Sequence, residues 1–595
     1  MKQIKKLQDM LRGLTDAFGR YPLTALFLLA AAAVNAADII TGEDYSKYLM
    51  VFAVGAFLSV VMQASYERFF YKPAGRWALM AAAVILTAGY YLVVMPAPEL
   101  GIETGVRTSV ALLALLVAFI WVPSVRSSIS FNESFMIAFK AFFNALLFSG
   151  VIMAGIGIII AAADQLLFQV HGDAYSHTAN IVFILFAPMY FLSLVPVYPG
   201  EADKGREQEY LDLKAEKVNR AAYCPRFLEI LISYVIIPLL SVFTIILAAY
   251  ILRNIGGRFW TDNLLEPMLV SYSITVILLY ILASGLENRF AIYFRRIFPK
   301  VLVPIVIFQI IASVLSLGDT GFTHTRYYVV LFGIFAAASG IVLSVVPVRK
   351  NGIVAAILVA FAVTSIIPPV DAFTVSRASQ TARLEKVLLK NNMLAGNSIK
   401  PNADISEEDK KAIVKAFDYL RRMDYTGSLV WLPADTDGYR DFSSIFGFNE
   451  YDIPGNQSEN VYLVLEQQMP VDIKGYDTLV NINVNIPGGK TTEKLLELEK
   501  QGVKYTLSKY TAEEQCDIIL SEGENRELIR FSTREMFDRL SGYNSGKGSI
   551  TPGEAAFSAE NEAAKIRVIV RNANIDKGQD SMTCYAELYV LVTIK

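Results

Sequence analysis

Cysteine and histidine are both scarce in this sequence, which has three of each among 595 residues. The cysteines, Cys224, Cys516 and Cys584, form no CxxC pair and no Cys/His spacing of the kind that holds zinc. The sequence also lacks a phosphate-binding glycine loop, a GxSxG elbow and an HExxH helix. It therefore carries no catalytic signature, and it predicts no cofactor.

Charged residues are also few, and they are distributed unevenly. They make up 18% of the chain, whereas 54% is hydrophobic. Up to Val370, apolar stretches long enough to cross a bilayer core of about 30 Å recur, and we count eleven, the first at 22–40 and the last at 353–370. Backbone amides need internal partners in hydrocarbon, so these segments are expected to be helices. Proline removes a backbone donor, so kinks or local breaks are expected within them, at Pro188, Pro238 and Pro304.

Lysine and arginine are divided unequally between the connections, and this division predicts the orientation of the chain. One alternating set of connections, which includes the N-terminus, holds 22 Lys and Arg, and the other set holds 5. Positive residues resist translocation, so the first set is expected in the cytoplasm. An odd number of spans then places the C-terminal part outside.

Four regions follow from this pattern. Residues 1–21 combine five basic residues with apolar residues at helical spacing, which indicates a cytoplasmic amphipathic helix on the inner leaflet. A signal peptide cleaved near Ala36 is the alternative, although the charged region is long for that class. The transmembrane helical domain is expected over 22–370, a helix and linker over 371–404, and a soluble domain over 405–595.

The C-terminal part changes from a helical period to a period of two. Helical patterns at 376–390 and 406–424 are separated by a linker rich in Asn, Gly and Pro. From 480 to 486, Val and Ile alternate with Asn, which is typical of a half-buried strand. Further helices are expected at 492–501 and 526–540. The fold class predicted for the whole chain is a polytopic α-helical membrane protein of about 11 transmembrane helices with a C-terminal extracytoplasmic α+β domain.

The two cysteines of this domain allow two interpretations. Cys516 and Cys584 form a disulfide if the domain lies outside the cell and the two thiols meet. The favoured interpretation is that both are half-buried small apolar residues.

All three histidines fall in connections that the charge distribution places outside. A metal site at this outer mouth is one hypothesis, and its residues are His171, His177, His324 and Asp164. The favoured alternative is solvated loop histidines, because His171 and His177 lack the i, i+4 spacing of a helical ligand pair.

A cation beside two tyrosines marks the expected outer boundary of the tenth span. Arg326, Tyr327 and Tyr328 are expected to contact a lipid headgroup, a ligand or the C-terminal domain. The alternative is an ordinary interface anchor. In the same way, the charged connection at 199–226 is interpreted as a solvated helix face, with partner docking as the alternative.

The predicted spans hold almost no ionisable groups, and the deeper polar residues are mainly Asn35, Gln63, Asn144 and Gln309. Ionisable groups usually mark a proton or ion path, so a proton-coupled carrier is disfavoured, although a carrier of amphiphilic cargo is not. The soluble part shows no basic stripe with interleaved aromatics, so nucleic acid is set aside as a partner. The expected partners are the lipid bilayer and, as a hypothesis, an envelope protein.

Four local patterns resemble one family. They are Arg20-Tyr21-Pro22-Leu23-Thr24, the segment from Leu231 through Pro238 to Leu239, the segment from Gly321 to Tyr328, and a run from Pro369 through Ala372 to Ser376, Ser379, Gln380, Arg383 and Leu384, with a later Gly475-Tyr476-Asp477. Together they are similar to the bacterial multi-pass membrane family catalogued as domain of unknown function four-one-five-three. The resemblance implies a bacterial cell membrane and this architecture, and it implies no activity, cofactor or substrate.

These observations favour a bacterial cell-envelope membrane protein that acts as a non-enzymatic sensor, scaffold or assembly factor with an external domain. The first alternative is a transporter or lipid-handling protein, which the many spans and their prolines favour. The second is a membrane-embedded metal-dependent enzyme that uses the histidines of the outer mouth.

Overall fold

The computed structural model describes the chain except residues 1, 96–99, 204, 255–264, 434–440, 451–459, 467–469, 487–489, 513–514, 524–525, 544–547 and 578–581. The described chain divides into two compact units. The first unit contains Met1–Arg383 and Asp418–Tyr425, and the second contains Leu384–Phe417 and Thr426–Lys595. Each unit is described by itself below.

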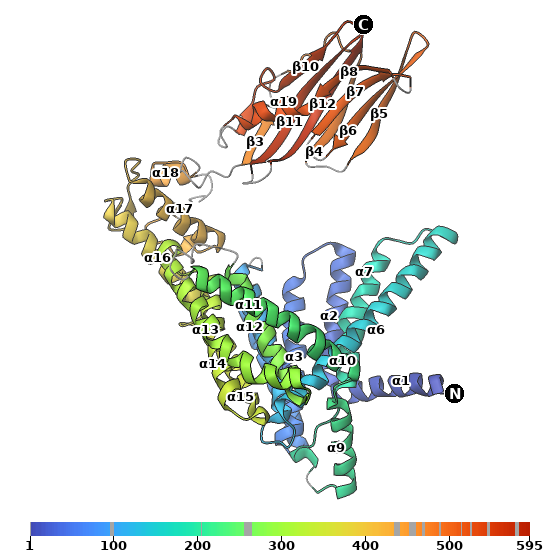
Figure 1. Cartoon of the computed structure of the whole chain (residues 1–595), viewed down its shortest axis with the longest axis vertical. Helices are drawn as coiled ribbons and strands as arrows, with labels where there is room; N and C mark the ends of the chain where they lie inside the picture. Colours follow the sequence, from blue (N-terminus) through green and yellow to red (C-terminus); the bar gives the residue numbers. More distant parts are fainter. Residues whose placement is uncertain are drawn as a thin grey trace. The chain divides into compact units, whose positions relative to one another are not determined.

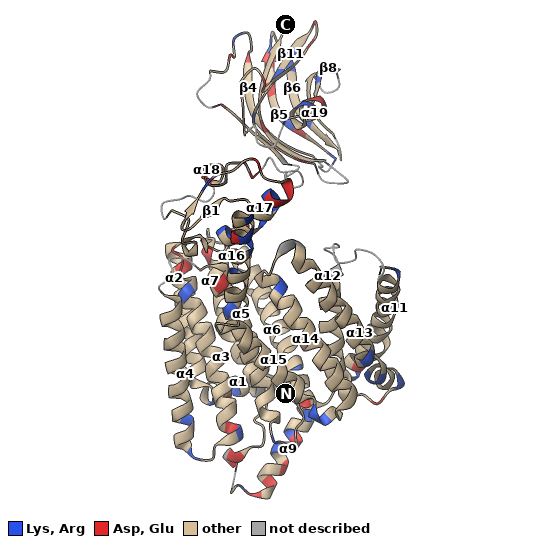
Figure 2. Ribbon diagram, turned by 90° about the vertical axis from the view of Figure 1, so that its left-hand side faces the viewer, with Lys and Arg blue, Asp and Glu red and all other residues tan. Residues whose placement is uncertain are grey.

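The first unit is a helical bundle, and its described part contains eleven helices that are long and apolar enough to cross a membrane. These spans, with their elements, are Pro22–Thr41 (α2), Ser46–Phe69 (α3), Pro73–Val94 (α4), Ile102–Ser124 (α5 and η1), Phe131–Leu166 (α6), Asp173–Leu194 (α7, η2 and α8), Arg226–Asn254 (α10, η4 and α11), Glu266–Gly285 (α12 and η6), Arg289–Gly318 (within α13), His324–Val345 (α14) and Val348–Ile366 (η7 and α15). The number predicted from hydropathy is therefore confirmed. Figure 2 shows that charged residues of this unit gather towards the two ends of the helices, with uncharged surface between.

Some described α-helices of the first unit are not candidate spans. They include α1 (Lys2–Arg20), α9 (Gln208–Ala222) and the first part of α16 (Ala372–Lys390). Helix α1 ends at Arg20, two residues before Pro22, which occupies the first turn of α2, where its missing N–H costs no hydrogen bond. Figure 1 shows α1 running across the direction of α2. An orientation across the spans is the one that an interfacial helix adopts in a membrane.

Two of the three prolines expected to break a span do so in the same way. Pro188 and Pro238 each stand two residues after a π-helical segment, Asn180–Phe186 (η2) and Leu231–Ile236 (η4). Proline lacks the N–H and clashes with the carbonyl four residues back, which favours the wider π turn before it. Pro304 is different, because α13 continues through it from Arg289 to Thr320.

Small residues allow α13 and α14 to approach closely. A Cβ atom added at Gly340 would lie 2.9 Å from a Val303 methyl group and 3.0 Å from the Pro299 carbonyl oxygen, and one added at Gly333 would lie 2.7 Å from Ile310. Lipid tails are as apolar as the side chains of a helix, so the hydrophobic effect does not drive helices together within a membrane. Small residues let the backbones approach closely, and the helices then associate through van der Waals contacts.

The second unit contains helices and two main sheets that share one apolar core. The six-stranded sheet has the order β4 (Thr478–Ile486), β12 (Met582–Ile594), β11 (Ala564–Lys577), β3 (Asn460–Leu465), β9 (Gly548–Ile550), with β10 (Ala556–Glu560) also pairing β11. The four-stranded sheet has the order β5 (Thr491–Lys500), β6 (Val503–Ala512), β7 (Gln515–Glu522), β8 (Arg526–Ser532). All described pairs in these two sheets are antiparallel except β3 with β9. The helices are α17 (Glu407–Arg422, whose last turn belongs to the first unit), α18 (Phe442–Phe446) and α19 (Thr533–Ser541), and a small hairpin joins β1 (Leu394–Ala395) to β2 (Ser398–Ile399).

The α+β class is confirmed, but two predicted helices of this unit are wrong. Residues 492–501 were expected to be helical, and instead they form strand β5. Residues 526–540 were expected to form one helix, and they divide into strand β8 and helix α19. Leu, Glu and Lys at 493–500 favour a helix locally, but pairing with β6 along the whole strand overrides that preference.

Cys516 and Cys584 lie on strands of different sheets, and both are buried and free. Burial, with a smaller contribution from Asp538, raises the pKa of Cys584 to about 11. The structure thus agrees with two buried small residues and shows no disulfide between these cysteines.

Candidate functional site

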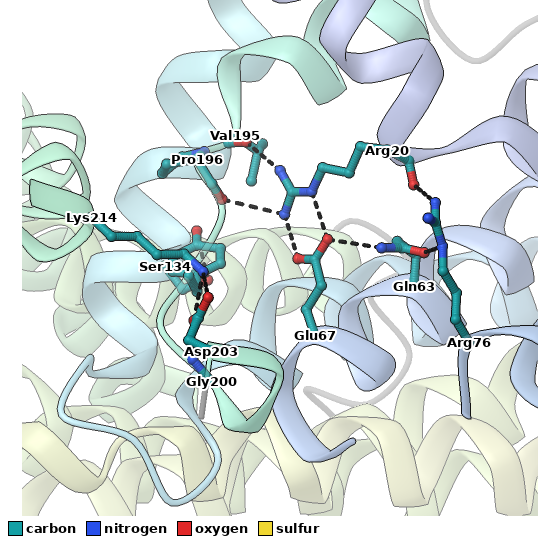
Figure 3. A network of polar contacts seen from close by, with 11 residues as sticks. Arg20, Gln63, Glu67, Arg76, Ser134, Val195, Pro196, Gly200, Asp203 and Lys214 are labelled. Carbon is teal, nitrogen blue, oxygen red and sulfur yellow. Dashed lines mark hydrogen bonds and ion pairs between the residues drawn. The ribbon is translucent and has the colours of Figure 1, made fainter. Parts of the chain in front are cut away.

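A buried ion pair joins α1 to α3 in the first unit. The Arg20 guanidinium donates from Nε and Nη2 to the two oxygens of Glu67, at 2.8 and 2.7 Å, and the two side chains are 14% and 13% exposed. The Gln63 side-chain amide donates to Glu67 at 2.9 Å. Arg76 of α4 donates to the oxygen of the same amide at 3.1 Å (Figure 3). We call Arg20, Gln63, Glu67 and Arg76 the Glu67 network.

The backbone completes the Glu67 network. Arg20 also donates to the carbonyl of Val195 at 2.8 Å, and Arg76 donates to the carbonyl of Arg20 at 2.9 Å. A charged pair removed from water is stable only when its remaining donors and acceptors form hydrogen bonds. The carbonyls of Val195 and Arg20 accept from guanidinium N–H groups that Glu67 and Gln63 leave free. The network therefore connects α1, α3, α4 and the end of α8.

A second buried pair fixes the helix that follows. Lys214 of α9 lies with its ammonium 2.8 and 2.6 Å from the two oxygens of Asp203, and the Gly200 N–H donates to the same carboxylate (Figure 3). Both side chains are about one-tenth exposed. The connection at 199–226, interpreted from sequence as a solvated face, thus contains a buried ion pair that ties α9 to the residues before it.

The space beside the Arg20–Glu67 pair is almost filled. Arg20, Glu67, Phe119 and Tyr198 line a small cavity of about 10 Å³, which is room for one water molecule. Burial raises the pKa of Tyr198 to about 12, so its hydroxyl is protonated at neutral pH. The immediate surroundings of the Glu67 network therefore leave no room for a ligand larger than water.

A second cluster lies where the chain leaves the last span. Asp371 is fully buried, and its Oδ1 accepts from Arg107 at 2.6 Å and from the N–H groups of Phe373 and Thr374 at 3.0 and 3.1 Å. Burial alone would raise the pKa of Asp371, but hydrogen bonds from Thr374 and Arg107 lower it. Asp371 is therefore an ionised cap at the start of α16.

The Asp371 cluster extends to the segment 418–425 of the first unit. Arg107 also pairs with Glu103 at 2.8 Å, and the Tyr425 hydroxyl donates to Glu103 at 2.6 Å. Burial, followed by this hydrogen bond, raises the pKa of Tyr425. The Arg377 guanidinium lies over the Tyr425 ring at 5.4 Å. Glu103, Arg107, Asp371, Arg377 and Tyr425 form what we call the Asp371 cluster.

His324 lies next to this cluster and is partly buried. Its ring stacks on Phe373 with the centroids 5.3 Å apart, and its Nδ1 lies 3.0 Å from the Tyr419 hydroxyl. The preceding turn is also held, because the Phe322 carbonyl accepts from Gln380 at 3.0 Å. Two segments quoted for the family resemblance, at 321–328 and at 369–384, therefore pack against each other.

Arg326, Tyr327 and Tyr328 each have a partner within the first unit. Arg326 Nη1 lies 3.5 Å from Glu266 of α12, the Tyr327 hydroxyl donates to the Val370 carbonyl at 2.7 Å, and Tyr328 reaches the Ser365 carbonyl at 3.5 Å. The structure thus shows contacts within the first unit for these residues, and the contacts with lipid, ligand or the C-terminal domain stay predictions.

The other residues of the hypothetical metal site have local partners. His171 lies 3.0 Å from Asp173, with both side chains exposed, and Asp164 accepts from the Val170 N–H at 2.7 Å. His177 stands in the short helix α7. Across the described ranges, no group of three or more His, Cys, Asp or Glu side chains is arranged to hold a metal ion. The structure therefore offers the metal hypothesis no ligand set.

A larger cavity of about 630 Å³ opens among four connections at the helix ends that the charge distribution assigns to the cytoplasm. Its polar lining includes Glu133, Glu229, Glu287 and Arg349, and the native Cys224 lies in its wall. Glu229 accepts from Asn288 at 3.1 Å, directly before the π-helical segment η4. Burial, together with Glu229, raises the pKa of the Cys224 thiol.

The comparison with family models decides where the chain belongs. Residues 23–404 match the model described as Domain of unknown function (DUF4153), which covers well over half of the chain. The chain belongs to this family. The DUF4153 match contains the segments at 231–239, 321–328 and 369–384, whereas Gly475–Asp477 lies beyond it. No curated protein and no solved structure matches the chain.

Sequence reasoning missed two largely buried ion pairs of this DUF4153 protein, Arg20–Glu67 and Lys214–Asp203. Glu67 stands at the end of a predicted span and Lys214 in a charged connection, both positions where solvent exposure is the usual outcome. The available signal was Arg20-Tyr21-Pro22, which carried the resemblance and places a cation at the start of the first span.

Proposed function

We propose that this DUF4153 protein is a non-enzymatic sensor of the bacterial cell envelope. In this proposal the C-terminal domain lies outside the cytoplasm and recognises a partner, and the transmembrane bundle responds. The N-terminus and α9 lie in the cytoplasm, as the distribution of Lys and Arg predicts.

The observation that carries the proposal is the Asp371 cluster. It joins residues of 372–383 and 418–425 to the ends of α5 and α14. In the sequence, 372–383 precedes and 418–425 follows residues 384–417, which belong to the second unit. The chain is therefore tied to the spans both before and after that part. Buried, directional contacts of this kind transmit strain, because a packed core has discrete arrangements and deforms little between them.

Two further observations support a role without catalysis. His324 has aromatic partners and His171 pairs with Asp173, and the described residues hold no group suited to a metal ion. At the opposite end of the bundle, the Glu67 network joins α1, α3 and α4 through hydrogen bonds. Such an arrangement suits a switch that is held in one state until a perturbation is large enough to break it.

The native Cys224 allows a direct test, because it lies at the helix ends opposite the Asp371 cluster. In the full chain reconstituted in lipid, Asp371→Asn removes the carboxylate charge while keeping its shape, and we expect the alkylation rate of Cys224 to change by at least about fivefold. The control is Asp173→Asn, which makes the same change at the same end but in an exposed pair with His171. Equal Cys224 rates in wild type and both variants would contradict the sensor proposal and favour a static scaffold.

Lipid handling is the second candidate, and one residue favours it. Gln309 of α13 is 1% exposed, and neither atom of its amide has a hydrogen-bond partner. An unpaired amide inside a membrane bundle is costly and often marks a path for a polar group. Lipid handling predicts that the wild-type chain translocates a fluorescent lipid in vesicles and that Gln309→Leu does not. Asn144→Leu, an exposed amide on α6, is the matched control.

A further inference from the structure

The outer face of the six-stranded sheet carries a group of asparagine and tyrosine side chains. The inner face packs in the apolar core, where Ile482 and Val484 of β4 are buried, so the residues next to them point outward. The strands β4, β12, β11 and β3 lie side by side in this sheet (Figure 1). We call six of their outward residues the Asn–Tyr face: Tyr462, Asn481, Asn483, Asn485, Asn574 and Tyr585.

The register of the strands places these residues in a row across the sheet and in a line along β4. Asn485 of β4 stands opposite Tyr585 of β12. Tyr585 stands opposite Asn574 of β11, which stands opposite Tyr462 of β3. Neighbouring strands lie about 4.8 Å apart, so this row is about 14 Å wide, and outward residues repeat at about 7 Å along β4. The Asn–Tyr face is therefore large enough to contact several units of a linear polymer.

Folding does not explain the asparagines of this face. Asn is depleted in strands, because its short polar side chain competes for backbone hydrogen bonds. All four asparagines are exposed, and their side-chain amides have no hydrogen-bond partner among the described residues. Tyr462 is 54% exposed, although an aromatic ring is stabilised by burial. Residues that contradict a local preference without a compensating contact are expected at functional sites.

The charges among these residues cancel each other. The Tyr585 hydroxyl donates to Glu587 at 3.2 Å, and Glu587 pairs with Arg571 at 3.3 Å. The Arg571 guanidinium lies over the ring of Tyr589 at 5.0 Å. None of the six residues of the Asn–Tyr face is itself charged. Such a surface complements an uncharged ligand, whereas nucleic acid and anionic lipid require an excess of basic residues.

The side chains indicate which uncharged ligand fits. Each Asn amide offers two N–H donors and a carbonyl acceptor, so it pairs reciprocally with another amide or with hydroxyl groups. A tyrosine ring has a negative face, against which the C–H groups of a sugar ring can pack. Protein partners usually bury an apolar centre at an interface, and here amides occupy the centre. Amides that repeat at about 7 Å beside aromatic rings therefore match a glycan whose sugars carry acetamido groups.

We propose that the Asn–Tyr face binds a glycan chain of acetamido sugars. The asparagine amides form hydrogen bonds with acetamido and hydroxyl groups, and the rings of Tyr462 and Tyr585 pack against the faces of the sugars. This inference rests on the proposed function, because it names the partner that the C-terminal domain recognises outside the cytoplasm.

Titration calorimetry of the full chain in lipid nanodiscs tests the proposal, with the tetramer of N-acetylglucosamine as the probe. Nanodiscs avoid sugar-based detergents, which would compete for the face. Wild type should bind the tetramer, and Asn483→Thr should weaken binding by about fivefold, the usual contribution of one hydrogen bond. Tyr462→Ser should weaken binding by at least as much. Glu499→Thr, at an exposed position of β5 in the other sheet, should leave the affinity unchanged.

Thermal unfolding separates lost binding from lost folding. Thr is a better strand former than Asn, so Asn483→Thr should not lower the melting temperature of the full chain. A wild-type chain that does not bind the tetramer would overturn the proposal, and so would equal affinities for wild type, Asn483→Thr and Tyr462→Ser. The alkylation rate of Cys224 reports on the proposed function separately. Tetramer binding that leaves this rate unchanged would contradict the sensor and support the glycan site.

Discussion

Replacement of Glu67 by glutamine tests the energetics of the first unit most directly. Glu67→Gln keeps the size of the side chain but leaves the Arg20 guanidinium, which is 14% exposed, without its counter-charge. Breaking a buried pair by neutralising one partner costs about 3–5 kcal/mol. The lower end applies here, because glutamine still accepts one hydrogen bond and Arg20 still donates to the Val195 carbonyl.

The expected shift in melting temperature follows from the size of the unit. The entropy of unfolding is about 2.1 cal/mol/K per residue, which for a unit of roughly 400 residues is about 0.8 kcal/mol/K. A loss of about 3 kcal/mol therefore lowers the Tm by roughly 4 °C. The assay is thermal unfolding of the full chain in detergent, followed by the fluorescence of its tryptophans.

Two controls make this prediction specific. Glu216→Gln changes the exposed pair with Arg220, whose side chains are 64% and 82% exposed, and such pairs contribute about 0–1 kcal/mol. The double change Arg20→Met with Glu67→Met removes both charges, and we expect it to be less harmful than Glu67→Gln alone. Equal Tm values for Glu67→Gln and Glu216→Gln would refute the argument that burial gives this pair its energy.

Three further predictions use other parts of the molecule. Gly340→Ala should destabilise the α13–α14 contact by about 1–3 kcal/mol through overpacking, whereas Gly150→Ala, which meets nothing within 4 Å, should not, as measured by thermal unfolding. Folding lowers the pKa of Asp371 below its ordinary 3.8. The stability that its carboxylate gives the first unit is therefore complete above pH 3.8 and is lost as the pH falls through the folded pKa. Asp371→Asn removes this contribution, so the acid unfolding of the first unit should be less steep below about pH 4. In intact cells, Cys224 should react with permeant reagents only, whereas Ser444→Cys should react with impermeant ones; the reverse would overturn the orientation.

Hydropathy determined the membrane part of this fold by itself. Eleven apolar stretches predict eleven helices because hydrocarbon permits no unpaired backbone, so length and composition suffice. Alternation of Val and Ile with Asn at 480–486 likewise identified strand β4, because one buried face of a sheet imposes a period of two.

The tertiary structure decided what depends on distant partners. Residues 491–500 favour a helix locally and form strand β5, since pairing with β6 outweighs their propensity. His324 was assigned to solvent from its place in a loop, but it stacks on Phe373 of a segment about fifty residues later. The same holds for Glu67 and Lys214, whose burial depends on Arg20 and Asp203 in other segments. Periodicity reports which face of an element is buried, whereas the pairing of charges depends on contacts that form only when distant segments pack together.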